Sequence, residues 1–182
     1  MVWREPTDTG WRVEASADIA EVRVLDPGGI VQGTLQVPPR PVFTGRFAKR
    51  QNKVTTAAFE RNGPRLITGR PVELKLPEGG GATVQDGAKA AMRRAKKGGT
   101  AALRGRDYRL RHVFGRKARV LRDGTEIAVL KRRGGLRSLR VARTSTAATD
   151  LTDELVLTIF EKVIKPGRSG ACSEIVSALD LP

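Results

Sequence analysis

Residues 151–164 read LTDELVLTIFEKVI, and eight of these fourteen residues are apolar. Apolar residues cover more than one face of a helix of this length, which is typical of a helix buried on most sides. Carboxylates open the segment and lysines close it, as the helix dipole favours, and a Pro-Gly pair then ends it. These charged residues are Asp150, Asp153, Glu154, Lys162 and Lys165. A buried strand is the alternative, but the length and Glu161-Lys162 favour a helix.

The chain before this helix alternates short β-prone runs with turn signals, which indicates an antiparallel sandwich or barrel. Asp26-Pro27-Gly28-Gly29, Asn62-Gly63 and Asp123-Gly124 each separate two such runs and predict three hairpins. In 107–113 the residues alternate, and 126–130 is apolar on both faces, which predicts a strand buried on both sides. The strands expected are 19–25, 30–37, 53–60, 65–68, 71–76, 107–113, 116–121, 126–131 and 136–141.

Two further helices are predicted. After a glycine-rich loop at 77–81, residues 86–97 resemble a short helix with Asp86 as the N-cap and Gly98-Gly99 as the terminator. Its apolar residues are alanines and one methionine, so we expect a basic helix on the surface. A second short helix is expected over 171–179.

The predicted fold is therefore mainly β, within the β-rich α+β class. It is an antiparallel barrel or sandwich with a hydrophobic helix near the C-terminus and a short basic surface helix. The 182 residues fit one domain, 1–182, with a core over about 15–165 and a C-terminal extension at 166–182. Apolar residues at 39% are enough for a hydrophobic core.

Short strands followed by one very apolar helix resemble the tubby-like barrel, which includes tubby C-terminal domains, phospholipid scramblases and LURP-one-related proteins. The hairpin 116–131 and the segment TDELVLTIF at 152–160 carry this resemblance, over roughly 15–165. It implies a closed antiparallel barrel of twelve strands around a hydrophobic helix. About nine strands are counted here, and the basic helix at 86–97 is not expected in such a barrel. Some members bind phosphoinositides, but no family motif places those residues in this sequence.

The net charge of +15 is concentrated in the middle of the chain. Residues 40–143 carry 28 basic and 7 acidic residues, whereas residues 1–39 and residues 144–182 each carry 3 basic and 6 acidic residues. A positive segment of this size attracts nucleic acid, anionic lipid headgroups or acidic protein surfaces. The same composition also fits a protein that uses arginine for solubility alone.

Three basic clusters are candidates for binding an anionic partner. The first is Arg46, Lys49, Arg50 and Lys53; the second is the helix with Lys89, Arg93, Arg94, Lys96 and Lys97; the third is Lys131, Arg132 and Arg133 with Arg137 and Arg140. Contact with phosphates requires such residues on one face. Few aromatic residues accompany them, and no helix-turn-helix, zinc-finger or ribonucleoprotein motif occurs.

The sequence offers no recognisable catalytic, cofactor or metal site. His112 is the only histidine, so a site built on paired histidines is excluded. Cys172 is the only cysteine; with His112 it would form a nucleophile–base dyad, but its spacing to Ile175 and Val176 favours a small core residue. Paired carboxylates remain an alternative only through tertiary contacts. No glycine-rich phosphate-binding loop is found.

We therefore expect a non-enzymatic β-barrel domain whose basic surface binds an anionic partner, either lipid headgroups or an acidic protein. A non-specific nucleic-acid-binding protein is the alternative, and an enzyme of unrecognised type is the third hypothesis. The single cysteine and the lack of a signal peptide or an apolar span predict a cytoplasmic protein, peripheral at a membrane surface in the lipid case. The sequence does not predict an oligomeric state.

Overall fold

The computed structural model describes residues 2–16, 21–37, 44–46, 48, 50, 59, 63, 64, 66, 69–87, 98–114, 117–133 and 140–166. The elements described without gaps are eleven strands and one helical segment. The strands are β1 Val2–Pro6, β2 Arg12–Ser16, β3 Glu21–Leu25, β4 Val31–Gln36, β5 Pro71–Lys75, β6 Gly81–Asp86, β7 Gly99–Leu103, β8 Arg106–Phe114, β9 Lys117–Arg122, β10 Thr125–Arg132 and β11 Val141–Ser145. Helix α2 spans Leu151–Ile159 and continues as a π-helical turn, η2, over Phe160–Ile164.

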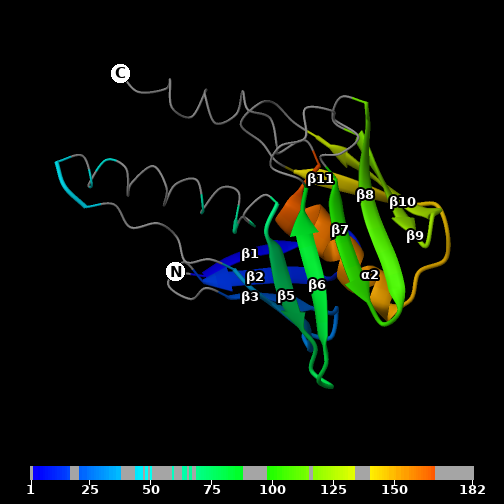
Figure 1. The fold of residues 1–182 in the computed structure, drawn as a ribbon, viewed down its shortest axis with the longest axis horizontal. Coiled ribbons are helices and arrows are strands. Elements are labelled where there is room, and N and C mark those ends of the chain that lie inside the picture. Colours follow the sequence, from blue (N-terminus) through cyan, green and yellow to red (C-terminus); the bar gives the residue numbers. More distant parts are fainter. Residues whose placement is uncertain are drawn as a thin grey trace.

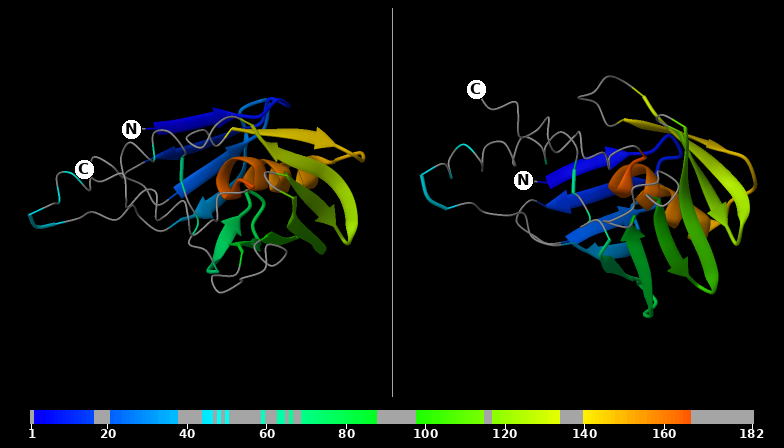
Figure 2. Two further views of the ribbon diagram at one scale, coloured as in Figure 1. Left: turned by 90° about the horizontal axis from the view of Figure 1, so that it is seen from above. Right: turned by 45° about the horizontal axis from the view of Figure 1, so that its top comes forward.

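The strands form one antiparallel sheet in which each strand pairs with the next along the chain, from β1 to β11. The sheet curls around α2 and η2, so that the helical segment fills the inside of the curl (Figures 1 and 2). Strands β1 and β11 are the two edges, and the sheet is not closed between them. The predicted mainly β architecture around a hydrophobic helix is confirmed, as a single curled sheet.

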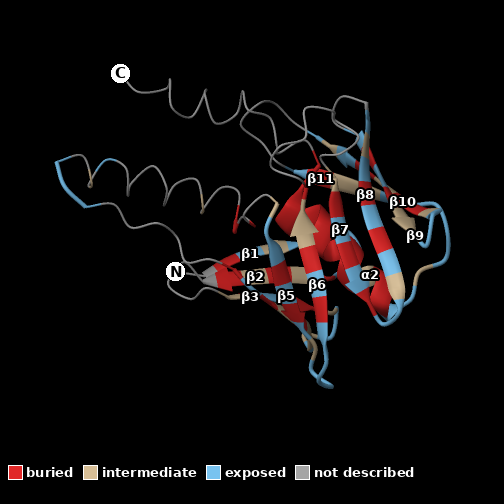
Figure 3. Ribbon diagram, viewed as in Figure 1, coloured by how far each residue is buried: buried red, intermediate tan, exposed pale blue. Residues whose placement is uncertain are grey.

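The helical segment is buried along almost its whole length, as its composition predicts (Figure 3). The expected core residues Leu155, Ile159, Phe160 and Val163 are each 3% exposed or less. Glycines let the sheet approach the helix closely: a Cβ atom on Gly33 would lie 3.2 Å from Leu155 Cδ1. Asp150 caps the helix, and its side chain accepts a hydrogen bond from the Asp153 N–H.

Most of the predicted strands are present, close to their expected limits, and the Asp26–Gly29 and Asp123-Gly124 hairpins are confirmed. In β8 the alternation holds, with Tyr108 and Leu110 buried and Arg109 and Arg111 exposed. The prediction that residues 126–130 are buried on both sides is wrong, because Val129 is only half-buried. The register shifts between Glu126 and Ala128, and this bulge turns both Ile127 and Ala128 into the core.

Four strands were not predicted: β1, β2, β6 and β7. The predicted loop at 77–81 is present as a tight turn, in which Gly79 and Gly80 have positive φ, and β6 begins at Gly81. Asp86 is the last residue of β6, and the helix that it is predicted to cap lies outside the described residues. Gly99 begins β7, where a Cβ atom would lie 2.7 Å from Ile164 Cδ1, so packing against the helix explains this glycine.

Other boundaries also differ. Phe59 has helical backbone and accepts a hydrogen bond from the Gly63 N–H, so the strand expected over 53–60 is wrong at Phe59. Of the strand expected over 136–141, residues 136–139 lie outside the described residues, Arg140 is not in a strand, and β11 begins at Val141. Residues 88–97 and 171–179, where the two further helices are predicted, lie outside the described residues.

Candidate anion-binding surface

Five basic side chains on β8, β9 and β10 point to the outside of the sheet. Antiparallel register places Arg111 opposite Arg119, and Lys117 opposite Lys131. Residues directly opposite each other project from the same face, with Cβ atoms about 5 Å apart. Arg109 precedes Arg111 by two residues, about 7 Å along the same face of β8. We call the outward side chains of Arg109, Arg111, Lys117, Arg119 and Lys131 the basic face.

The basic face contains two like-charge pairs across neighbouring strands, an arrangement that destabilises a sheet. Within the described part of the chain, one of its members is paired with a carboxylate: Arg119 Nε lies 3.2 Å from Glu126 Oε2. Among the described residues, no carboxylate forms an ion pair with Arg109, Arg111, Lys117 or Lys131. The sheet therefore holds unneutralised positive charge where pairing with carboxylates would stabilise it.

The outer face of β1–β3 provides an internal comparison. Its arginines are matched by glutamates: Arg4 Nε lies 3.1 Å from Glu14 Oε1, and Arg23 Nε lies 2.7 Å from Glu21 Oε1. Arg12 Nε is 3.4 Å from the same Glu14 oxygen. On β1–β3 each of the three arginines lies beside a glutamate, two of them sharing Glu14, whereas four of the five cations of the basic face have no such partner among the described residues.

A buried carboxylate anchors the strands that carry the basic face. Asp153, fully buried at the start of α2, accepts hydrogen bonds from Tyr108 Oη at 2.8 Å and from Arg122 Nη1 at 2.5 Å. Arg106 Nη1 lies 2.6 Å from Asp150 Oδ2 and 3.4 Å from Asp153 Oδ1. Because these partners come from β8 and β9, the network fixes both strands to the helix.

This network changes the acidities of its members. Burial, together with the hydrogen bond to Asp153, raises the pKa of Tyr108 to about 12, although Arg106 opposes the shift. The hydrogen bond from the Asp153 N–H lowers the pKa of the Asp150 carboxyl group, and so does Arg106. Burial opposes this shift but does not cancel it. Tyr108 therefore stays protonated at neutral pH and donates to the Asp153 carboxylate.

A second buried charged network lies where the sheet is open. Arg143 on β11 donates to Glu154 Oε2 and to Thr9 Oγ1, each at 2.7 Å, which joins β11 to the β1–β2 turn. On the helical segment, Lys162 and Lys165 both reach Glu5 of β1. These lysines were expected to interact with the end of the helix dipole; their burial against Glu5 shows that they tie the helix to β1.

Glu161 is the most buried carboxylate of this second network. It lies 2.9 Å from Lys162 Nζ and 3.8 Å from Arg143 Nε. Burial raises the pKa of Glu161, and the two cations only partly offset that effect. The network thus uses side chains to join the two sheet edges that no strand pairing connects.

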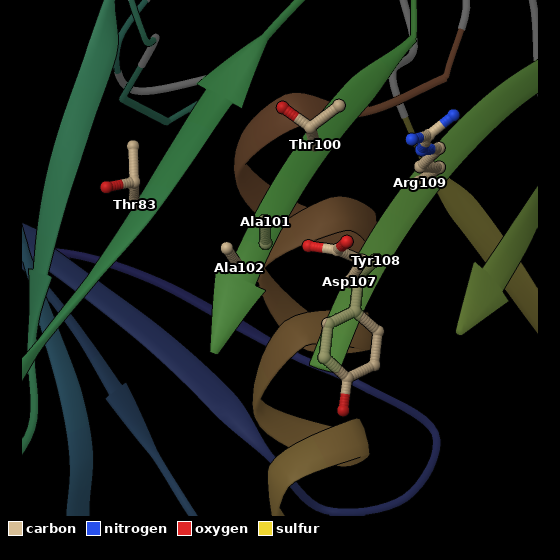
Figure 4. A pocket seen from close by; sticks show the side chains of 7 residues that line it. All are labelled: Thr83, Thr100, Ala101, Ala102, Asp107, Tyr108 and Arg109. Atoms are coloured by element: carbon tan, nitrogen blue, oxygen red, sulfur yellow. The ribbon is translucent and has the colours of Figure 1, made fainter. Parts of the chain in front are cut away.

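Two shallow hollows flank Arg109 on the outer face. The first, of about 210 Å³, lies over β6–β8, where the small side chains of Thr100 and Ala102 leave room beside Asp107 and Arg109 (Figure 4). The second, of about 430 Å³, lies over β8 and β9 and extends to the β9–β10 turn. Its lining is Asp107, Arg109, Arg111, Leu121, Asp123 and Gly124.

The structure separates the residues predicted to bind an anion. Lys131 belongs to the basic face, Arg133 is exposed just beyond β10, and Arg132 is half-buried with its alternating position on the other face of the strand. None of the three predicted basic clusters is described in full. The five cations of the helix predicted at 86–97, Lys49 and Lys53 of the first cluster and Arg137 of the third lie outside the described residues. Sequential antiparallel pairing places the last residues of β4, β6 and β10 at one end of the sheet.

The sequence-based prediction missed Arg109, Arg111, Lys117 and Arg119. The alternation in 107–113 already placed the first two on the outer face, and the Asp123-Gly124 turn sets the register that brings Lys117 beside Lys131. These residues are brought together by strand pairing, so they do not form a cluster along the sequence. His112 is half-buried on β8, and Cys172 lies outside the described residues, so the dyad is not tested.

Within the described ranges, no three His, Cys, Asp or Glu side chains gather as metal ligands. The same part of the chain contains no helix with the length and hydrophobicity needed to cross a membrane. A scan of protein-family models, a search of curated proteins and a search of solved structures each returned no match.

Proposed function

We propose that this chain is a non-enzymatic binding domain whose basic face binds an anionic partner, either lipid headgroups or the acidic surface of a protein. The observation that carries the proposal is the pair of like-charge contacts, Arg111 with Arg119 and Lys117 with Lys131. Like charges directly opposite each other destabilise the free protein. When an anionic partner is bound, the same charges attract it and stabilise the complex.

The position of the face supports the same function. Lys117 and Lys131 lie where β9 begins and β10 ends, at the end of the sheet to which the three basic clusters are connected. The proposed resemblance to the tubby-like barrel rests on the antiparallel strands around an apolar helix. The open edges at β1 and β11 differ from the closed twelve-stranded barrel of that family.

Nucleic acid is the alternative partner, because its phosphates would meet the same cations. Among the described outward side chains of β8–β10 there is no aromatic ring on which a base could stack. Binding of this kind would read the phosphate backbone and no sequence.

The test uses a triple variant and a charge-matched control. R111Q/K117Q/K131Q removes three cations from the basic face, and R4Q/R23Q/K75Q removes three from β1, β3 and β5. Binding to vesicles containing anionic lipid and to duplex DNA is measured across a salt series. At about 1 kcal/mol for each cation near an anionic surface, the first variant weakens vesicle binding by about 100-fold at low salt and flattens the salt dependence.

The control variant has the same net charge and retains most of the binding. Equal losses in the two variants would show that net charge alone drives association and would contradict a role for the basic face. Tighter binding to DNA than to vesicles at every salt concentration would favour the nucleic-acid alternative.

A further inference from the structure

The larger hollow on the basic face has two chemically different walls. Arg109 and Arg111, successive outward residues of β8, supply guanidinium groups, and Asp107 and Asp123 supply carboxylates at the other end. Gly124 leaves one side open and Leu121, opposite Arg109, gives an apolar base. A surface that only attracted polyanions would carry no carboxylates here, because they repel phosphates.

The acidic wall is held in place by its own backbone. The Asp107 N–H donates to Asp123 Oδ1 at 2.8 Å, and the Asp123 N–H donates to the Asp107 carbonyl, also at 2.8 Å. Asp123 has φ of 49°, a turn conformation that this reciprocal contact stabilises. The Asp107 carboxylate itself is exposed beside the hollow, and a hydrogen-bond donor on a ligand can reach it.

We infer, on the basis of the proposed function, that this hollow is the binding site of a hydroxyl-bearing phosphate ester such as a sugar or polyol phosphate. We call it the phosphate-ester site. The phosphate dianion binds between Arg109 and Arg111, whose forked N–H groups match phosphate oxygens. A hydroxyl group on the ester donates to Asp107. A diphosphate would place its second anionic group against the two carboxylates, which disfavours it.

The smaller hollow extends the same site. Asp107 and Arg109 line both hollows, and across β7 and β6 the hydroxyl-bearing side chains of Thr100 and Thr83 follow (Figure 4). Thr100 lies directly opposite Arg109, and Ala102 directly opposite Asp107. A polyol longer than three carbons bound through its phosphate therefore passes over small side chains toward further hydrogen-bonding groups.

Isothermal titration with two defined probes tests the site. Glycerol 3-phosphate carries both the phosphate and hydroxyl groups, and methyl phosphate carries the phosphate alone. We expect glycerol 3-phosphate to bind at least about fivefold more tightly, because a hydrogen bond to a charged acceptor adds to the phosphate contacts. In D107N the ratio of the two dissociation constants falls toward one, whatever the change in net charge does to both.

Two double variants separate the phosphate-ester site from the effect of net charge. R109Q/R111Q lowers the affinity for glycerol 3-phosphate by at least about tenfold, whereas R4Q/R23Q, which makes the same change in net charge on β1 and β3, leaves it within about twofold. Equal effects of the two variants, or no preference for glycerol 3-phosphate over methyl phosphate, would refute the phosphate-ester site. In that case R111Q/K117Q/K131Q would still lose vesicle binding. Refutation of the phosphate-ester site is therefore distinguishable from refutation of the proposed function.

Discussion

Replacement of Asp153 by Asn removes one buried negative charge and little volume. The carboxylate of Asp153 has three hydrogen-bonding partners besides the more distant Arg106: Tyr108, Arg122 and the Asp150 N–H, the last at 3.1 Å. The amide keeps one acceptor oxygen, but its NH₂ group must face a donor. Removing one partner of a buried ion pair costs about 3–5 kcal/mol. Because Arg122 is 29% exposed and can be hydrated, we expect about 3 kcal/mol.

Urea unfolding at neutral pH measures this loss, followed by the fluorescence of Trp3 and Trp11, both buried in the fold. The control is D150N. Asp150 is the exposed N-cap of the same helix, and asparagine caps a helix as well as aspartate does, so this variant should lose less than about 1 kcal/mol. A D153N loss below about 1 kcal/mol would refute the role given to the buried carboxylate.

Tyr108 reports on the same contact, because it is the only tyrosine in the chain. Its pKa of about 12 lies above the ordinary 10.0, so the folded protein keeps a proton that the unfolded chain loses. The stabilisation is complete below pH 10, and about 2–3 kcal/mol of it is lost as the pH rises to 12. In D153N the tyrosinate absorbance should titrate between these two values, since burial still raises the pKa. An unchanged titration would show that Asp153 does not act on Tyr108.

Three further predictions follow from the packing and from the absence of a recognised catalytic pair. Phe160→Ala should lower the free energy of unfolding by about 3–5 kcal/mol, because the ring is fully buried between helix and sheet; a loss under about 1 kcal/mol in urea unfolding would contradict that packing. Gly33→Ala should cost about 1–3 kcal/mol in the same assay, since its Cβ would lie 2.9 Å from Leu74 Cδ1 and 3.2 Å from Leu155 Cδ1; a neutral effect would mean that both leucines move aside freely. His112→Gln and Cys172→Ser should leave vesicle binding unchanged and should leave any turnover found in the protein unchanged; loss of turnover in a folded variant would restore the nucleophile–base dyad.

The buried helix and the main hairpins were predictable because their signals are local. Eight apolar residues in fourteen, an acidic start and a Pro-Gly stop identify the helix without knowledge of its surroundings. Asp123-Gly124 likewise specifies its own turn. Strands β6 and β7 escaped prediction because the glycines beside them were interpreted as loop and helix terminator. Their actual causes are a tight turn at Gly79 and Gly80 and the close approach of Ile164 to Gly99, a contact between residues far apart in the sequence.

The candidate site was only partly predictable for a related reason. Clusters along the sequence grouped Lys131 with Arg132, but neighbouring residues of a strand face opposite sides of the sheet. Pairing groups Lys131 with Lys117, and Arg111 with Arg119, across hairpins and turns. The role of Asp153 was seen only as helix capping, because its contacts with Tyr108 and Arg122 require the folded sheet.

The most direct test of the central claim, that the outer face of β8–β10 is the anion-binding surface, is a backbone amide NMR titration of the whole chain with inorganic phosphate. The largest shift changes should fall at Arg109, Arg111, Lys117 and Lys131, and should decrease as salt is added. The amides of Arg4 and Arg23, whose side chains are paired with glutamates, should change little. Equal changes on β1–β3 and β8–β10, or changes confined to residues outside β8–β10, would contradict the claim.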